Sequence, residues 1–131
     1  MPKGVERPKG VEQTEYIALA PGISIEEYFG EDHGWPTVVA LRGSQMVGAI
    51  STSKRGLICG PLKVSVKPGI FIAIKLIEHY EEELRKMGVG AYLLRVEQSN
   101  KRWMGALIKS GLCAPIGADG NHQWFKREIK L

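Results

Sequence analysis

The sequence predicts a single α/β domain of the α+β type, with a mixed, mostly antiparallel sheet and helices on its faces. Two observations predict this fold class. Several short β-rich runs separated by turn residues come before a long segment, residues 70–87, with helical periodicity. Another β-rich run follows that segment, which indicates a strand–helix–strand crossover of the right-handed kind.

Length and composition are those of one globular domain. The chain has 131 residues, enough for a hydrophobic core, and 44% of them are apolar. No apolar run approaches the roughly 20 residues of a membrane span. The first residues lack the apolar segment of a secretion signal. We therefore expect a cytoplasmic protein with no membrane contact.

The first 13 residues predict a flexible arm, and residues 14–131 predict the single domain. The arm contains a direct repeat, Pro2–Glu6 and Pro8–Glu12, whose proline, glycine and charged residues bury little apolar surface. A tethering role and an inert leader both fit this composition.

The net charge of +4 is dispersed along the chain. The cationic pairs Lys54-Arg55, Lys101-Arg102 and Lys126-Arg127 have acidic residues between them. Nucleic-acid-binding proteins concentrate such charge in a patch or stripe. The charge pattern therefore argues against nucleic acid as a partner, although an anionic cofactor would also be attracted.

Four segments of the first half are rich in β-forming residues: 15–20, 37–42, 45–52 and 57–66. Gly43-Ser44 fits a two-residue type II′ hairpin turn, because glycine supplies the positive φ that this turn needs. Pro61 cannot donate to a ladder, so the fourth strand is expected to be bulged or unpaired there. Ser24–Glu27 predicts a capping box that starts a short helix, and residues 31–36 predict a loop.

Residues 70–87 carry the most regular helical pattern of the chain. One apolar stripe contains Ala73, Leu76, Ile77, Tyr80, Leu84 and Met87. The opposite side is polar and contains Lys75, Glu78, Glu81, Glu82, Arg85 and Lys86. We expect favourable pairs four residues apart, Glu81 with Arg85 and Glu82 with Lys86. Gly88 is expected to end the helix.

The remaining chain predicts a strand, a helix and a hairpin. Residues 91–97 form a buried strand, and Ser99 or Asn100 then caps a helix that runs to Ser110. Gly111 closes that helix. The final hairpin consists of residues 112–116 and 122–130, joined by the loop 117–121.

This order of elements, together with three segments, resembles the GNAT superfamily of N-acetyltransferases. Residues 72–88 (IAIKLIEHYEEELRKMG) are similar to the long central helix of the family and its terminal glycine. Residues 92–100 (YLLRVEQSN) resemble the strand that ends in the V-x-x-x-N signature. Residues 100–112 (NKRWMGALIKSGL) resemble N-x-x-A-x-x-x-Y-x-K-x-G-F and share its asparagine, lysine and glycine. The short form also resembles GNAT-type proteins encoded by bacteriophages.

The resemblance implies acetyl-CoA as a co-substrate, held in a cleft where the fourth and fifth strands of the family separate. The free edge of the fourth strand, residues 62–66, would pair with the pantetheine amides, and the next helix N-terminus would hold the pyrophosphate. Pro61 by itself fits a plain edge strand equally well. The positions that match cofactor-binding residues are Leu62, Val64, Val66, Lys67, Gly69, Ile70, Phe71, Ile72, Ala73, Asn100 and Trp103.

Three features depart from the family pattern. The phosphate loop Q/R-x-x-G-x-G/A aligns with Pro68–Ala73, where Phe71 replaces a glycine and Lys67 supplies a point charge instead of an arginine. The family's tyrosine, a general acid for the departing thiolate, aligns with Leu107. Trp103 replaces a small alanine, and it either covers the cleft or joins the core. A single short helix before residue 37 would leave the acceptor side open or completed by another subunit.

Acetyl transfer to an amine needs a proton acceptor for the ammonium and a donor for the tetrahedral oxyanion. Glu97, at the end of a predicted strand, is the catalytic residue that we predict, acting through water. Four carboxylates would attract a cationic amine: Glu26, Glu27, Glu31 and Asp32. His122 and Cys113 are weaker candidates. Both Cys59 and Cys113 are interpreted as buried apolar residues, and the three histidines lack the spacing of a metal site.

The sequence thus predicts an N-acetyltransferase that uses acetyl-CoA and an amine on a small molecule or a protein. The alternative is a catalytically silent GNAT-like module that binds a cofactor or a partner. A basic nucleic-acid-binding domain is a third and less favoured interpretation. A homodimer is compatible with a final strand at the edge of the sheet.

Overall fold

The computed structural model describes residues 13–21, 34–53 and 58–131. Within these residues, seven strands and two helices follow the predicted order of elements. The strands are β1 (Glu15–Ala18), β2 (Gly34–Arg42), β3 (Gln45–Thr52), β4 (Ile58–Val64), β5 (Ala91–Glu97), β6 (Ala114–Ala118) and β7 (His122–Glu128). The helices are α2 (Ile70–Lys86) and α3 (Lys101–Ser110).

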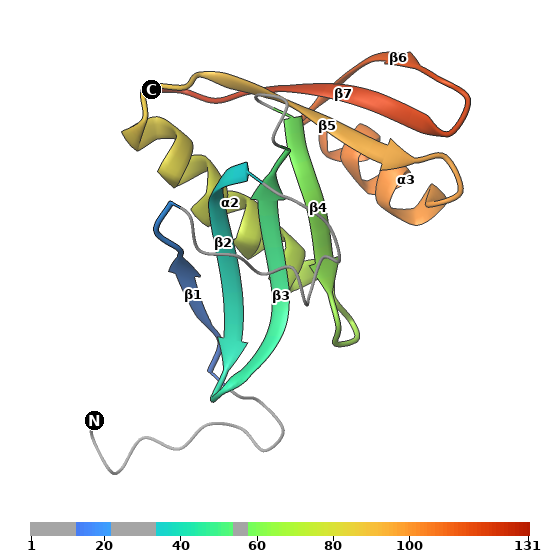
Figure 1. Cartoon of the computed structure of the whole chain (residues 1–131). Coiled ribbons are helices and arrows are strands. Elements are labelled where there is room, and N and C mark those ends of the chain that lie inside the picture. Colours follow the sequence, from blue (N-terminus) through green and yellow to red (C-terminus); the bar gives the residue numbers. More distant parts are fainter. Residues whose placement is uncertain (1–12, 22–33, 54–57) are drawn as a thin grey trace.

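The strands form one twisted sheet in the order β1-β2-β3-β4-β5-β7-β6 (Figure 1). β4 and β5 are parallel, and every other neighbouring pair is antiparallel. Helix α2 connects the two parallel strands, because parallel neighbours need a long crossover. The predicted fold class, a mixed and mostly antiparallel sheet with helices packed on it, is confirmed.

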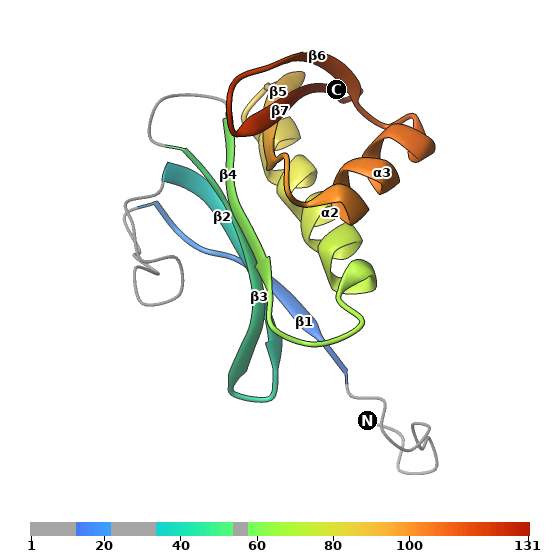
Figure 2. The same cartoon turned by 90° about the vertical axis from the view of Figure 1, so that its right-hand side faces the viewer.

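Both helices lie on the same side of the sheet (Figure 2). The apolar stripe of α2 packs onto the sheet, and its residues Leu76, Tyr80 and Leu84 are fully buried. On β5 the buried side chains alternate with more exposed ones, so Tyr92 and Leu94 point toward the helices. The core therefore lies between the helices and one face of the sheet.

Predicted local signals determine the ends of several elements. Gly43 has φ +60°, and its neighbour Ser44 has no positive φ, which is the pattern of the predicted type II′ turn between β2 and β3. Asn100 caps α3 by accepting a hydrogen bond from the Trp103 N–H at 3.2 Å. Gly88 and Gly111 follow the two helices with left-handed backbone, as expected.

Several predicted boundaries are wrong. β1 ends at Ala18 rather than at residue 20, β4 is Ile58–Val64 rather than 57–66, and β7 ends at Glu128 rather than at residue 130. Strand pairing explains two further differences. β2 begins at Gly34 rather than at residue 37, because Gly34 pairs with Thr52 of β3. Residues 34–36 therefore belong to the sheet. β6 lies at residues 114–118 rather than 112–116, since Gly117 and Ala118 pair with β7. The arm before residue 13 and the short helix predicted after Ser24 lie outside the described residues.

Glu81 is the clearest error of the helical pattern. The sequence places it on the polar side of the helix, but the side chain is buried, with 3% of its surface exposed. Its carboxylate accepts hydrogen bonds from Arg127 on β7 at 2.8 and 2.9 Å and from the Tyr92 hydroxyl at 2.6 Å. The nearest Arg85 contact is 3.9 Å. Buried charges require such pairing, and here it joins α2 to β5 and β7.

Of the two ion pairs predicted four residues apart, Glu81 with Arg85 is present at 3.9 Å, whereas Glu82 pairs with Arg85 and not with Lys86. Arg85 pairs with Glu82 at 3.2 Å, and Lys86 pairs with Glu83 at 3.0 Å, both three residues apart. In the described part of the chain, neither helix is long and apolar enough to cross a membrane.

Candidate active site

The parallel strands β4 and β5 pair only at their first contact and then separate. Their register contains two pairs, Ile58 with Leu93 and Cys59 with Leu94. Beyond Cys59, β4 and β5 run apart to their ends at Val64 and Glu97 (Figure 1). The predicted opening between these two strands is therefore present.

A bulge in β4 accounts for the separation. Ile50 pairs with Leu62, and Thr52 pairs with Cys59, so two steps on β3 correspond to three on β4. The extra residue falls at the Gly60-Pro61 step, where the proline nitrogen cannot donate to a neighbouring strand. A bulge bends and twists its strand, and here it redirects β4 from β5 while the pairing with β3 continues. The predicted irregularity at Pro61 is confirmed.

The free edge of β4 presents backbone groups to the opening. The Ser65 N–H donates to the Val47 carbonyl at 2.9 Å, so Ser65 points toward β3. Backbone groups alternate in direction along a strand that pairs with an antiparallel neighbour. The N–H and C=O groups of Leu62 and Val64 therefore point toward the side from which β5 has departed.

Helix α2 begins beside this edge with three unused donors. Its first intrahelical bond runs from the Ala73 N–H to the Gly69 carbonyl at 2.9 Å. The N–H groups of Ile70, Phe71 and Ile72 have no acceptor among the described residues. The first turn has no acidic residue, and Gly69 makes no side-chain cap. This helix end therefore has the free donors and the positive dipole end that attract an anion.

The side chains of this turn point in different directions. Ile72 and Ala73 are buried against the sheet, so their side chains belong to the core. Phe71 is 75% exposed, and Lys67 is also exposed. Because the Ala73 N–H is already bonded, the donors that remain available belong to the three residues before it.

Helix α3 starts directly after β5, at the same edge of the sheet. Its first turn carries Lys101 and Arg102, both exposed, and no acidic residue. Cations at a helix N-terminus oppose the dipole and are unfavourable by themselves. An anion bound near this edge would interact favourably with both the helix dipole and these two cations. Asn100 already uses its side-chain oxygen as the helix cap.

An apolar groove of about 210 Å³ lies between α2 and α3, with β5 as its floor. The predicted residues Ile70 and Trp103 line it, and Leu107 contributes to the same wall. Trp103 also packs against the core, which agrees with the second of its two predicted roles. The other lining residues are Ile74, Ile77, Glu78, Glu81, Tyr92, Leu94, Ala106, Ser110, Leu112, Cys113 and Arg127.

No phenol takes the place of the family's tyrosine in the described part of the chain. Leu107, at that position, is buried and apolar. The hydroxyl of Tyr80 is bonded to Thr52 at 2.9 Å, and that of Tyr92 donates to Glu81. Burial raises the pKa of both phenols well above the usual range. Neither one is poised to give a proton to a leaving thiolate.

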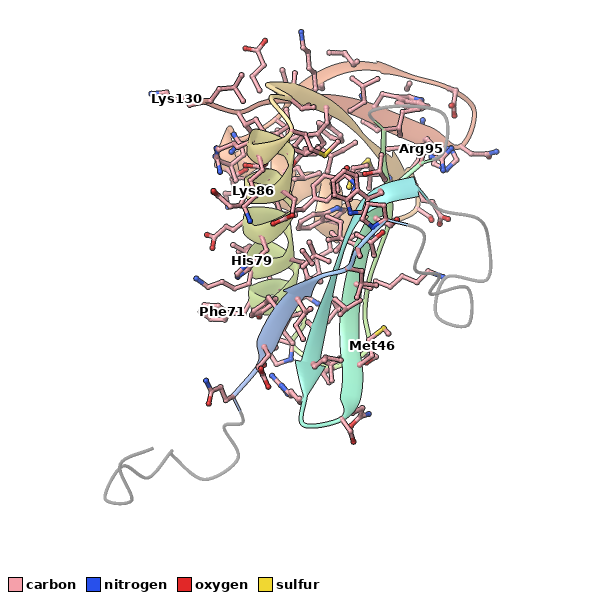
Figure 3. The ribbon with its side chains drawn as sticks, turned by 60° about the vertical axis from the view of Figure 1, so that its left-hand side comes forward. Met46, Phe71, His79, Lys86, Arg95 and Lys130 are labelled. Carbon is pink, nitrogen blue, oxygen red and sulfur yellow. The ribbon has the colours of Figure 1, made fainter. Side chains whose placement is uncertain are left out.

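Glu97 lies at the end of β5, on the face of the sheet away from the helices. Val96 is buried, and the alternation of β5 turns Arg95 and Glu97 outward; Figure 3 shows Arg95 on the side away from α2. The register of β5 and β7 places Glu97 opposite His122. Sequence reasoning missed this juxtaposition, because nothing local indicates which residues of the two strands face each other.

The other predicted candidates are four carboxylates and two cysteines. Glu26, Glu27, Glu31 and Asp32 lie outside the described residues. Cys59 and Cys113 are both buried and free, as predicted. Burial raises the pKa of the Cys59 thiol to about 12 and raises that of Cys113 as well.

Comparison with solved structures identifies the fold. An acetyltransferase (PaiA) from Thermoplasma acidophilum, solved with coenzyme A, aligns with a TM-score of 0.62 and 15% identity over 80% of this chain. The IAA acetyltransferase from Bacillus cereus aligns with a TM-score of 0.66 and 12% identity over 89% of this chain and 100% of its own. Aminoglycoside 6′-acetyltransferase type Ii aligns with a TM-score of 0.62 and 18% identity over 73% of this chain.

The chain therefore has the GNAT acetyltransferase fold, which confirms the predicted resemblance at the level of structure. The chain covers 66% of the length of the Thermoplasma protein and 70% of the length of the aminoglycoside enzyme. The sequence matches no protein-family model and no curated protein.

Proposed function

We propose that this protein binds acetyl-CoA in the opening between β4 and β5 and transfers the acetyl group to an amine. The observation that carries the proposal is the pairing of these strands at Cys59 and Leu94 and their separation beyond that point. Ligands of open α/β sheets bind at the carboxyl ends of parallel strands, where neighbouring strands diverge. Here that place also receives the N-termini of two helices.

The donors and charges at this edge suit a diphosphate. The free N–H groups of Ile70, Phe71 and Ile72 would hold phosphate oxygens, as helix N-termini do in other proteins. Lys67, Lys101 and Arg102 would add positive charge from both helix starts. A negative charge at an exposed helix N-terminus contributes about 0.3–1 kcal/mol.

The free edge of β4 suits an extended chain with amide groups. The outward-pointing backbone groups of Leu62 and Val64 would pair with the amides of a pantetheine arm, as an added strand would. A backbone N–H on this edge would also donate to the oxyanion formed when an amine attacks the thioester. The apolar groove beside Ile70 and Trp103 would accept less polar parts of the cofactor.

Solved relatives support this assignment. The structure from Thermoplasma acidophilum contains coenzyme A, and the fold of this chain superposes on it across 80% of its residues. The name of the aminoglycoside enzyme indicates an acceptor that carries amines. The acceptor of this chain is proposed only as an amine of a small molecule or a protein.

Leu107 favours a second candidate, a silent module that binds acetyl-CoA without turnover. No described tyrosine replaces the phenol that the family uses to protonate the thiolate. A thiolate is a weak enough base to leave without prior protonation, so a dedicated general acid is not required. We therefore favour the enzyme.

Two measurements separate these candidates. Calorimetry would measure the affinity for acetyl-CoA, with acetate and adenosine as controls. Release of free thiol would be followed with acetyl-CoA and a panel of spermidine, an aminoglycoside and a peptide with a free α-amine. Binding with thiol release supports the enzyme, and binding without release supports the silent module. No binding of acetyl-CoA would exclude both.

Two substitutions test the position of the phosphates. Pro68→Arg should tighten acetyl-CoA binding about fivefold at low salt, because it adds a cation beside the free N–H groups of α2. Phe71→Gly should also tighten binding, because it opens space around those groups. Gln45→Arg, at the exposed start of β3, adds the same charge elsewhere and serves as the control. If Pro68→Arg and Phe71→Gly both leave the affinity unchanged, the phosphates do not lie at this helix end.

A further inference from the structure

Three titratable side chains meet where β5 ends and β7 begins. His122 is the first residue of β7 and pairs with Glu97, the last residue of β5. Residues directly opposite in an antiparallel pair share a face, with Cβ atoms about 4.5–5.5 Å apart. Asp119, in the turn before β7, approaches the His122 ring, with 3.6 Å between Oδ1 and Nδ1. All three therefore lie on the face away from α2 and α3.

The turn that carries Asp119 is firmly held. The Asp119 carboxylate accepts from the N–H groups of Asn121 and His122 at 2.9 and 2.8 Å, and from the Trp124 indole at 3.0 Å. Gln98, the residue after β5, binds the same turn through the Asp119 and Asn121 carbonyls, both at 2.9 Å. The backbone that carries His122 opposite Glu97 is therefore held from both strands.

The arrangement leaves one ring nitrogen of His122 available. The Asp119 carboxylate lies on the Nδ1 side, which favours the tautomer with the proton on Nδ1 and a lone pair on Nε2. Nε2 makes no hydrogen bond to any residue within 13–21, 34–53 and 58–131. The ring is 27% exposed, so a substrate or one water molecule can reach it.

We propose that His122 accepts the proton that an ammonium acceptor must lose. Asp119 is the positioning residue, and Glu97 faces both the imidazole ring and the amine. This proposal rests on the proposed acetyl transfer. The ammonium gives one proton to Nε2, directly or through one water. The amine nitrogen then bonds to the thioester carbonyl carbon, the C–S bond breaks with its electron pair on sulfur, and a second amine proton goes to the thiolate. His122 returns its proton to solvent.

The charges around the ring favour this role. Asp119 faces it from the turn, and Glu97 faces it from β5. Arg95, the other charged residue on this face of β5, lies over the Trp124 ring with 5.9 Å between Cζ and the ring centroid. Two carboxylates against one guanidinium leave this face negative, which would attract a cationic amine.

The test compares two nucleophiles in the full-length His122→Gln variant. Alkylamines such as spermidine are protonated at neutral pH and need a base, whereas hydroxylamine is uncharged there and does not. We expect His122→Gln to lower kcat/KM for the best alkylamine of the panel about 100-fold, the lower range for a general base. We expect hydroxylamine acetylation and the affinity for acetyl-CoA to stay within about threefold, since neither needs the base. His79→Gln is the matched control, because His79 lies on α2 and stacks on Tyr16, away from this site.

Asp119→Asn tests the positioning role without removing the turn. Asparagine keeps an oxygen that can accept from the backbone, but it removes the charge beside Nδ1. The kcat/KM for the alkylamine should therefore fall while that for hydroxylamine stays within about threefold, a difference between nucleophiles that a purely structural role would not produce.

Each outcome has a distinct meaning. Equal losses with both nucleophiles in His122→Gln, or an unchanged rate with the alkylamine, would overturn the role of His122. A wild-type protein that acetylates hydroxylamine but no alkylamine would overturn it too. Failure of the wild-type protein to bind acetyl-CoA would instead reject the proposed function on which it rests.

Discussion

Glu81 of α2 and Arg127 of β7 form a two-point ion pair across 46 residues of sequence, with Nε and Nη2 at 2.8 and 2.9 Å from the carboxylate. The third guanidinium nitrogen, Nη1, donates to the Leu112 carbonyl at 3.2 Å. This pair joins the long helix to the strand next to β5. It also holds Leu112, which follows α3 and lines the groove between the two helices.

Arg127→Met should destabilise the protein by about 3 kcal/mol, because it leaves the buried Glu81 charge without its cation. Lys86→Met is the matched control, since it breaks an exposed pair with Glu83 and should cost less than about 1 kcal/mol. Urea unfolding of both variants measures the difference. Equal effects of the two substitutions would show that burial of the Glu81–Arg127 pair adds nothing to the free energy of unfolding.

Gly69→Ala should lower both stability, by about 1–2 kcal/mol, and acetyl-CoA affinity. A Cβ at Gly69 would lie 3.0 Å from Val64 Cγ1 and 3.1 Å from the Val66 carbonyl oxygen, so the first turn of α2 would have to shift. Gly105→Ala on α3 meets no atom within 4 Å and should stabilise the helix by about 0.5–1 kcal/mol. Thermal unfolding and calorimetry measure both effects. An unchanged affinity in Gly69→Ala would separate this turn from the cofactor.

Both cysteines should react slowly with a disulfide reagent in the folded protein. Burial raises the pKa of Cys59 to about 12 and also raises that of Cys113, so little thiolate is present at pH 8. We expect less than about a tenth of the labelling rate of the guanidinium-unfolded chain. Fast labelling of either thiol would contradict the packing around it, and slow labelling makes the thiol-release assay specific for coenzyme A.

Stability should fall in acid partly through Asp119. The Trp124 indole and two backbone N–H groups lower the pKa of this carboxyl from 3.8 to about 2. Because the folded pKa is depressed, the contribution of the carboxylate is complete above about pH 4 and is lost as the pH falls through about 2. The difference in urea midpoint between wild type and Asp119→Asn should therefore shrink between pH 4 and pH 2. A constant difference across that range would contradict the assigned shift.

Much of the fold could be predicted from local patterns. The long helix was expected at residues 70–87 and is observed at Ile70–Lys86, and β3 and β5 have the expected bounds. The irregularity at Pro61 was expected from the missing N–H and lies where β4 leaves β5. The start of β2 was missed because its pairing with Thr52, and not its own composition, makes Gly34 part of the sheet.

The sequence by itself determined where the chain turns and which periodicity each segment follows, because those properties depend on neighbours a few residues away. It thereby determined the order of elements and the irregularity at Pro61. Tertiary structure alone decided that Glu81 is buried against Arg127 and that His122 faces Glu97. Such partners are chosen by strand register and helix packing across distant segments, so no local pattern encodes them.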